Sequence, residues 1–362
     1  MAAQAPALLA TTGLDIRLAG ATDSKSMILA NSDAGMTHAA FPAALAERVE
    51  DWNAAAVDAA VSPVDLDSFV DALKARAASA GGSVVVVDNT SSEMVADKYA
   101  DWLAAGVHVI TPNKKANSGD LKRFEATKAA AAKGDAHWLY EGTIGAGLPI
   151  VSTLRTLRAS GDEVRSVQGI FSGTMSFLFN TWNPSEPFSA VVLAAKEAGF
   201  TEPDPRDDLN GLDVARKVVI AARESGLNLS LDDVSVTSLV PAELEECDAA
   251  EYLARLPEFD DVIAAQAKEA EAEGMVLRFV GKVDVAAGTG SVELSKFPKS
   301  HPFAGLQGAD NIVEIQSRRY SAEMESTPLI VRGPGAGAEV TAGGVFGDVC
   351  KLGAALGARV PL

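Results

Sequence analysis

The stretch TEPDPRDDLNGLDVARK, residues 201–217, gathers acids and bases where a loop gives way to a helical pattern. Its charged residues are Glu202, Asp204, Arg206, Asp207, Asp208, Asp213, Arg216 and Lys217. Two prolines and a glycine keep the first half out of regular structure, because proline fixes φ and lacks an amide donor. Carboxylates on such a rigid loop can bind an ammonium group, and a nearby lysine can give a proton to a reacting oxygen.

Asp213 and Lys217 are four residues apart and therefore share one face of the expected helix. An exposed ion pair with this spacing is common and contributes only about 0.3–0.5 kcal/mol. The acidic, proline-containing loop before the pair favours a second interpretation. In that interpretation two carboxylates hold a cation and Lys217 serves the reacting oxygen.

Polar residues also follow two apolar runs that are expected to be strands. The segment TPNKKA, which contains Lys114 and Lys115, comes directly after VHVI, and Thr90 and Ser91 come just after VVVVD. In doubly wound sheets, ligands bind beyond the carboxyl ends of the strands. These four residues are therefore candidates for a ligand site, although paired lysines also occur in plain solvated turns.

Two glycine-rich segments are further candidates. The segment EGTIGAGLP begins with Glu141 and has glycines that permit unusual backbone angles. A carboxylate followed by turned backbone carbonyls can bind a hard cation through oxygen, but a turn between domains would also explain it. The segment GPGAG (333–337) precedes the last helical pattern. Its amides could meet a cofactor, or it could be a strand-to-helix turn.

The surrounding patterns predict how these residues are positioned. Strand patterns cover 14–20, 84–88, 107–111 and 137–141, and helix patterns cover 65–80, 92–106 and 118–134. This alternation predicts an α/β doubly wound parallel sheet. Beyond residue 164 the order changes to a strand at 164–172, helices at 188–199 and 211–225, strands from 276 and a helix at 339–356. We expect a nucleotide-binding domain (1–150, completed by 333–362) and an α+β domain (151–332).

Composition narrows the class of function. The chain has 362 residues, 48% of them hydrophobic, which suits about two domains. Its net charge of −18 argues against broad nucleic-acid binding, which needs a basic surface, but not against a local anion pocket. Cys247 and Cys350 are far apart and fit no metal spacing, as in a reducing compartment. No run of 18 apolar residues is present, so we expect no membrane span.

In this order along the chain, seven segments resemble the homoserine dehydrogenase family. They are DNTSS, TPNKKANS, GAGLPI, GIFSGTMSFLFN, GFTEPDPRDDLNGLDVARK, LRFVGKVDV and RGPGAGAEVTAGGVFGDV. The resemblance runs from residue 14 to the C-terminus, and includes no kinase-like region. It fits a monofunctional enzyme or the dehydrogenase unit of a bifunctional aspartokinase–homoserine dehydrogenase.

The resemblance implies NADPH- or NADH-dependent reduction of aspartate 4-semialdehyde to homoserine, a step towards threonine, methionine and isoleucine. It also implies a homodimer formed through the strand-rich domain. We expect a cytoplasmic protein, or a plastid protein if a transit segment precedes this sequence.

Roles for individual residues come from the same resemblance. Lys217 would exchange the proton with the substrate oxygen, assisted by Lys114, and Glu202 and Asp213 would hold the substrate amino group. The implied cofactor contacts are Thr90, Ser91, Lys114, Gly199 and Gly337. The implied sodium ligands are Glu141 and the carbonyls of Ile144, Ala146 and Leu148.

One family feature has no counterpart in this sequence. No G-x-G-x-x-G or P-loop match occurs among its 31 glycines, whereas the family begins with a strand and such a loop, which cradles the pyrophosphate. Residues 14–20 would then be the family's second strand. We therefore expect an N-terminally incomplete Rossmann-like sheet with an exposed edge and weak cofactor binding. A truncated, catalytically silent homologue that only dimerises or binds substrate is the alternative.

Overall fold

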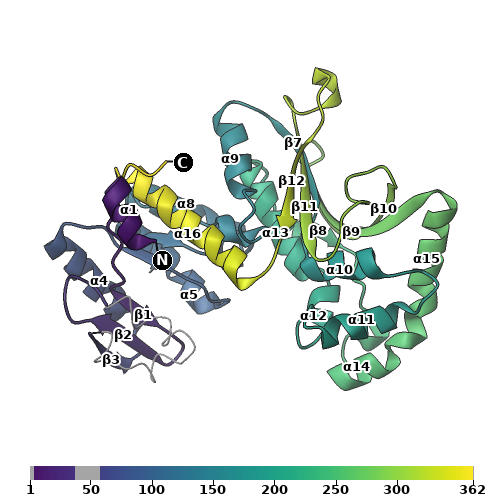
Figure 1. The fold of residues 1–362 in the computed structure, drawn as a ribbon, viewed down its shortest axis with the longest axis horizontal. Helices are drawn as coiled ribbons and strands as arrows, with labels where there is room; N and C mark the ends of the chain where they lie inside the picture. Colours follow the sequence, from purple (N-terminus) through teal and green to yellow (C-terminus); the bar gives the residue numbers. More distant parts are fainter. Residues whose placement is uncertain (1–3, 37–57, 362) are drawn as a thin grey trace.

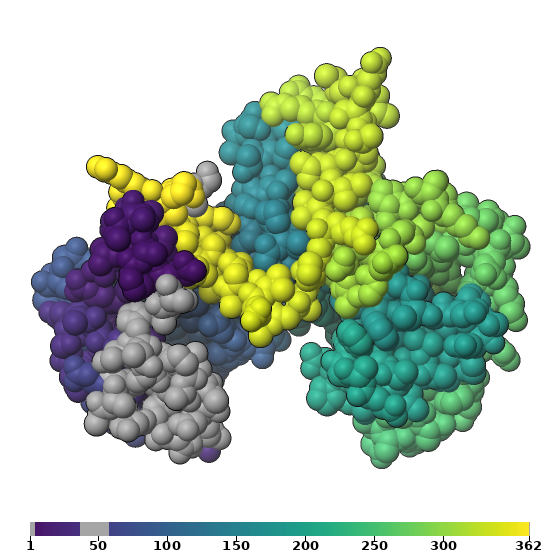
Figure 2. Space-filling model, viewed as in Figure 1, coloured from purple at the N-terminus to yellow at the C-terminus, as the bar shows by residue number. Residues whose placement is uncertain are grey.

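The computed structural model of the protein describes residues 4–36 and 58–361, which form two lobes (Figure 1). We call the lobe built from the described residues up to 141 together with α16 (Ala338–Ala355) the parallel-sheet lobe. The other, built from residues 164–334, is the six-stranded lobe. Figure 2 shows a notch between the two lobes, with the yellow residues around α16 joining them above it.

The parallel-sheet lobe confirms the predicted alternation of strands and helices. Its three parallel strands, in spatial order, are β4 (Val85–Val87), β5 (His108–Ile110) and β6 (Trp138–Leu139). The helices are α4 (Leu66–Ala80), α5 (Glu93–Asp97), α6 (Tyr99–Ala104), α7 (Lys115–Ser118) and α8 (Leu121–Lys133). Asp65 and Asp120 cap the amino ends of α4 and α8 by accepting hydrogen bonds from backbone amides, as N-cap residues do.

The predictions for the first strands need correction. Residues 14–19 lie outside any strand, and β1 comprises only Gly20–Thr22, because only these residues pair with the following strand. They form an antiparallel sheet of β1, β2 (Ser26–Ala30) and β3 (Ala59–Pro63), which follows helix α1 (Ala5–Thr12). β4 is also less buried than a continuous apolar run predicts. Among the described residues it pairs only with β5, and Val87 is 38% exposed.

The six-stranded lobe confirms the predicted α+β architecture. Its sheet has the order β12 (Leu329–Pro334), β11 (Asp310–Ser317), β7 (Val164–Ile170), β9 (Met275–Asp284), β10 (Thr289–Pro298) and β8 (Val234–Val236). Only the pairing of β8 with β10 is parallel. In Figure 1, below the sheet and to its right lie the helices α10 (Gly173–Thr181), α11 (Phe188–Glu197), α12 (Arg206–Leu209), α14 (Ala249–Arg255) and α15 (Asp260–Ala272). None of the helices that the structure describes has the length and apolarity needed to span a membrane.

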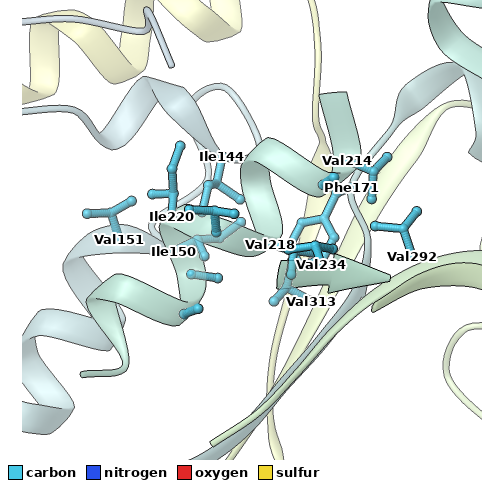
Figure 3. Packing of buried hydrophobic residues seen from close by; sticks show 14 of the residues in the cluster. Ile144, Ile150, Val151, Phe171, Val214, Val218, Ile220, Val234, Val292 and Val313 are labelled. Carbon is cyan, nitrogen blue, oxygen red and sulfur yellow. The ribbon is translucent and has the colours of Figure 1, made fainter. Parts of the chain in front are cut away.

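Helix α13 (Leu212–Glu224) connects the two lobes through its packing, and ten of its 13 residues are buried. It contacts β8, β9 and β10 on one side and α7 and α9 (Val151–Ala159) on the other. Figure 3 shows both sets of contacts. Val214 and Val218 lie beside apolar side chains of the sheet, and Ile220 lies beside Ile144 and Ile150. Burial of an aliphatic side chain contributes about 1.5–3 kcal/mol, so α13 is firmly held between the lobes.

Candidate active site

The candidate site lies where the loop after β5 meets the amino-terminal half of α13. Asp213 forms ion pairs with two lysines: its Oδ2 lies 2.8 Å from Lys217 Nζ, and its Oδ1 lies 3.2 Å from Lys114 Nζ. Lys114 immediately precedes α7, whereas Asp213 and Lys217 are one turn apart on α13. The structure thus joins three of the predicted site residues into one cluster that spans both lobes.

Lys217 is buried, which argues against the interpretation of this pair as an exposed surface contact. Its Nζ also donates a hydrogen bond of 2.7 Å to the carbonyl oxygen of Phe171, just after β7. A lysine ammonium has three N–H donors. One donor therefore remains after the contacts with Asp213 and Phe171, and the ammonium is fixed in orientation by the other two.

The charges in this cluster act on one another. Burial lowers the pKa of Lys114, and the charges of Lys217 and Arg216 act in the same direction, whereas Asp213 opposes them. Burial alone would raise the pKa of Asp213, but the two lysines outweigh it and hold that pKa well below its usual range. The cluster therefore keeps one ionised carboxylate beside a lysine that loses its proton more readily than an ordinary lysine.

Glu202 lies on the loop before α12, and its side chain is exposed. Its carboxylate forms no ion pair with any part of the chain that the structure describes, while its amide donates to Asp208 Oδ2 at 2.8 Å. Asp208 also contacts the Thr174 hydroxyl at 2.9 Å. Burial raises the pKa of Asp208, and the negative charge of Asp213 adds to this. Sequence reasoning gave no role to Asp208 or Thr174, and only the motifs that contain them pointed there.

Thr90 and Ser91 are exposed beyond β4, above a buried polar network. Asp88 Oδ1 accepts a hydrogen bond of 2.8 Å from the amide of Thr90, and its Oδ2 accepts one of 3.0 Å from Asn113 Nδ2. The Tyr99 hydroxyl donates to the same carboxylate. This network ties the carboxyl end of β4 to the loop that carries Lys114. Asp88, Asn113 and Tyr99 were not predicted, although Asp88 and Asn113 stand directly at or beyond strand ends in the sequence.

Gly199 and Gly337 both lie next to a helix end, in backbone conformations that favour glycine. Gly199 follows α11 with φ of +75°, and Gly337 precedes α16 with φ of +117°. Of the described residues beyond the chain neighbours, none lies within 4 Å of a β-carbon added at Gly199, and Val340 alone comes within that distance of one added at Gly337. Their backbones are therefore open to a close approach, but neither takes part in the hydrogen bonds of the cluster.

The expected sodium ligands show two different situations. The Glu141 carboxylate is buried and already accepts hydrogen bonds from Lys351 Nζ at 2.9 Å and from the Ser152 amide at 3.1 Å. By contrast, the carbonyls of Ile144 and Ala146 accept no hydrogen bond from the described residues, and Ala146 has a positive φ of +56°. The Leu148 carbonyl already accepts a hydrogen bond of 2.9 Å from the Ile150 amide. Only part of the backbone set is therefore open to a cation, and the carboxylate is committed to Lys351. The described residues contain no group of three or more His, Cys, Asp and Glu that could hold a metal ion.

Comparison with sequence families gives two matches that together cover most of the chain. The family described as "Homoserine dehydrogenase, NAD binding domain" matches residues 6–141, and the family described as "Homoserine dehydrogenase" matches residues 149–350. Among solved structures, a Candida auris protein titled as of unknown function has a TM-score of 0.83 at 38% identity, covering 97% of this chain and 94% of that one. A hyperthermophilic archaeal homoserine dehydrogenase in complex with NADPH shares the fold, with a TM-score of 0.71 at 20% identity over 99% of this chain and 96% of its own.

Named relatives give a consistent result. The chloroplastic bifunctional aspartokinase/homoserine dehydrogenase 1 of Zea mays is 48% identical over 98% of this chain, which spans 36% of that protein's length. The homoserine dehydrogenase of Saccharomyces cerevisiae is 45% identical over 308 residues, which are 83% of each chain. That of Emericella nidulans is 49% identical over 78% of each chain. By both of its matched parts and by these relatives, the chain belongs to the homoserine dehydrogenase family.

Proposed function

We propose that the chain is a homoserine dehydrogenase, which reduces L-aspartate 4-semialdehyde to L-homoserine with NADPH or NADH and catalyses the reverse oxidation. The observation that carries the proposal is the Asp213 carboxylate held between Lys114 and Lys217, which come from different lobes. The match of both the NAD-binding and the catalytic family descriptions supports an active enzyme over a silent homologue.

Two carboxylates are suited to hold the substrate ammonium group. Glu202 is exposed and has no ion-pair partner among the described residues, so it can accept a cation without losing another contact. Asp213 is 47% exposed, and each of its oxygens accepts one lysine. A carboxylate has about four acceptor positions, so capacity remains for the ammonium of aspartate semialdehyde or homoserine.

A bound reduced nicotinamide supplies the hydride that goes to the aldehyde carbon. As the new C–H bond forms, the carbonyl oxygen gains negative charge. The ammonium group of Lys217 stabilises the negative charge on this oxygen and donates its remaining N–H proton to it, which completes the alcohol. Asp213 and the Phe171 carbonyl hold the ammonium group of Lys217 in place during this step. Lys114, whose pKa is lowered, assists Lys217 by exchanging a proton within the same cluster.

For the cofactor we propose contacts from Thr90, Ser91 and Lys114 and from the backbones of Gly199 and Gly337. The proposal is supported by Asp88, whose carboxylate accepts hydrogen bonds from Thr90 and from Asn113. Asp88 thereby connects the carboxyl ends of two strands of the parallel sheet. Such ends are where doubly wound sheets bind ligands. We propose residues 1–150 with 333–362 as the nucleotide-binding domain and 151–332 as the substrate domain.

A homodimer, a sodium ion and the compartment also remain proposals. For the dimer, β12 supplies an edge that no described strand covers, with Ile330 41% exposed on it, and such edges favour pairing with another chain. For sodium held by Glu141, Ile144, Ala146 and Leu148, the open carbonyls of Ile144 and Ala146 give support. The Glu141–Lys351 contact and the hydrogen bond to the Leu148 carbonyl argue against it, so no step depends on the ion. The compartment is proposed as cytoplasmic, or plastid as in the name of the maize relative.

The test is NADPH oxidation by the chain with aspartate 4-semialdehyde, measured beside direct NADPH binding by fluorescence quenching. We expect saturable turnover and the reverse reaction with homoserine and the oxidised cofactor. Loss of both NADPH binding and turnover would contradict the proposed function and favour the silent homologue. Binding of NADPH without turnover would contradict the proposed activity alone.

A further inference from the structure

Arg223, near the carboxyl end of α13, is a buried guanidinium with an unusual set of partners. It is 5% exposed, and its three hydrogen bonds within the described part of the chain all go to backbone carbonyls. Nε donates to Leu229 at 3.0 Å, and the two terminal nitrogens donate to Asn117 at 2.9 Å and to Gly119 at 2.7 Å. No carboxylate among the described residues pairs with it. Its role is therefore the fixing of backbone and not the neutralisation of an acid.

Two of these three carbonyls, those of Asn117 and Gly119, form the carboxyl end of α7. This helix has four residues, and a single turn is not stable without tertiary contacts. Lys114 stands at its amino end, where the Lys114 carbonyl accepts hydrogen bonds from the amide and the hydroxyl of Ser118 at 2.9 and 2.6 Å. The same short unit thus has Arg223 at one end and Lys114 at the other.

The α13 helix supplies both the clamp and the site. Arg216 and Arg223 are seven residues apart, so they lie two turns apart on nearly one face, and Arg216 also reaches α7 at the Ser118 hydroxyl, 3.5 Å away. Asp213 begins this face one turn earlier. The guanidinium of Arg223 further stacks on Phe124 of α8, with 4.7 Å to the ring centroid. The contacts between α13 and the Lys114 loop therefore run along the helix from the site to Arg223.

This arrangement has an electrostatic cost. Burial lowers the pKa of Arg223 to about 10, because a charge removed from water without an acidic partner is disfavoured. The planar fork of arginine can satisfy several carbonyls at fixed angles, which a lysine cannot do. A costly contact of this kind is useful where geometry matters, and a misplacement of about 1 Å in an active site can reduce the rate by about 10²-fold.

We propose that Arg223 is a positioning residue of the candidate active site, which clamps α7 to α13 and thereby fixes Lys114 against Asp213 and Lys217. The kinetic part of this inference rests on the proposed function, whereas the position of Lys114 can be tested without turnover. Arg223 acts through Lys114 and does not itself touch the reacting atoms.

Arg278 on β9 provides a matched control. It is 7% exposed and likewise lacks an acidic partner among the described residues, and it also donates only to carbonyls. These belong to Leu277, Phe179, Phe303 and Ala304, all within the six-stranded lobe. Burial lowers its pKa as well. Replacing Arg278 should therefore disturb a buried arginine of the same kind without touching the Lys114 loop.

The experiment compares R223K, R223Q and R278K in the full chain. For R223K we expect kcat to fall by about 10- to 100-fold, with a smaller change in KM, while R278K keeps a kcat close to that of the unaltered chain. The second readout is the pH dependence of Lys114 acetylation by acetic anhydride, followed by peptide mass spectrometry. Release of α7 from α13 should expose Lys114 to solvent and move its pKa upwards, towards about 10.4, in R223K and not in R278K.

The outcomes separate the two proposals. Without turnover in the unaltered chain, the proposed function fails, and a shift in Lys114 reactivity confined to R223K and R223Q still supports the clamp. Equal kinetics and equal Lys114 reactivity in R223K and R278K would overturn the proposal that Arg223 positions Lys114. Failure of R223K and R223Q to fold, with R278K folded, would make Arg223 a folding residue and would also overturn the positioning role.

Discussion

Two charge clusters in this molecule combine lysines and carboxylates, one with two lysines around a carboxylate and the other with two carboxylates around a lysine. In the candidate site, one carboxylate, Asp213, lies between two lysines at 2.8 and 3.2 Å. Beside α16, one lysine, Lys351, lies between the carboxylates of Glu141 and Asp348 at 2.9 and 3.0 Å. The distances are nearly equal, so geometry alone does not tell which cluster is chemical and which is structural.

Exposure and spare hydrogen-bonding capacity distinguish them. The side chains of Glu141 and Asp348 are 6% and 3% exposed, and both also accept backbone amides, from Ser152 and Glu141 respectively. The Asp213 side chain is 47% exposed, and among the described residues it is paired with the two lysines alone. A carboxylate that is open to solvent and only partly satisfied can take a substrate cation, whereas a saturated and buried one holds the fold together.

Replacing the lysine of the first cluster should give the largest effect. In Lys217→Met, loss of the proton donor should lower kcat in the reduction by about 10³-fold, with the free energy of unfolding nearly unchanged because methionine fills the same space. Steady-state kinetics and urea unfolding measure the two quantities. Retention of more than a tenth of the kcat would show that Lys217 is not the donor.

The lysine of the second cluster should show the reverse pattern. In Lys351→Met, two buried carboxylates lose their cation, and we expect a loss of about 2 kcal/mol in unfolding free energy, reduced from the usual buried-pair value because Lys351 is 36% exposed. Burial already raises the pKa of Asp348, so protonation at acidic pH removes the unpaired charge. The destabilisation should therefore shrink as the pH falls. An equal loss at all pH values would argue against this explanation.

The sequence allowed the first cluster to be predicted in part, for a physical reason. Asp213 and Lys217 interact at helical spacing, which is visible locally, and Lys114 was found because polar residues beyond a parallel strand usually face a ligand site. The second cluster was missed because Glu141 and Lys351 are 210 positions apart. Their contact depends on how α16 docks beside the strand end, and no local pattern encodes that docking.

The fold shows the same division between local and distant determinants. The helix predicted at 211–225 was confirmed as α13, since caps and periodicity are local. The strand predicted at 14–20 was wrong for all but its last residue, because pairing with β2 sets where the strand begins. The clamp by Arg223 likewise depends on carbonyls about 100 residues away, so its helix position alone gave no signal.

Glu202 tests whether the open side of the first cluster binds the substrate ammonium. In Glu202→Gln the loss of one charged contact should raise KM for homoserine about tenfold, with a small change in kcat because the lysines remain. Asp207→Asn is the control, since it removes one negative charge from an exposed residue of α12, the helix that follows the Glu202 loop. A similar KM in E202Q and D207N would mean that the ammonium binds elsewhere.

The smallest expected effect concerns the charge that Arg216 places near Lys114. Reduction requires a protonated lysine, so the rate should fall as the pH rises through the pKa of the cluster, which lies below that of an ordinary lysine because burial and neighbouring cations lower the pKa of Lys114. Arg216→Gln removes one of those cations. The pKa of Lys114 should then rise, and the alkaline limb of kcat should move upwards by about half a pH unit or less, as screened charges allow.

Lys268→Gln is the control for this shift, because it removes the same net charge from an exposed position on α15, outside the lobe that carries Lys114. Its alkaline limb should coincide with that of the unaltered chain. If R216Q also leaves the limb in place, the group that titrates is not Lys114. The proton would then come from Lys217 alone, and the first cluster would use its second lysine only for charge, as the second cluster uses Lys351.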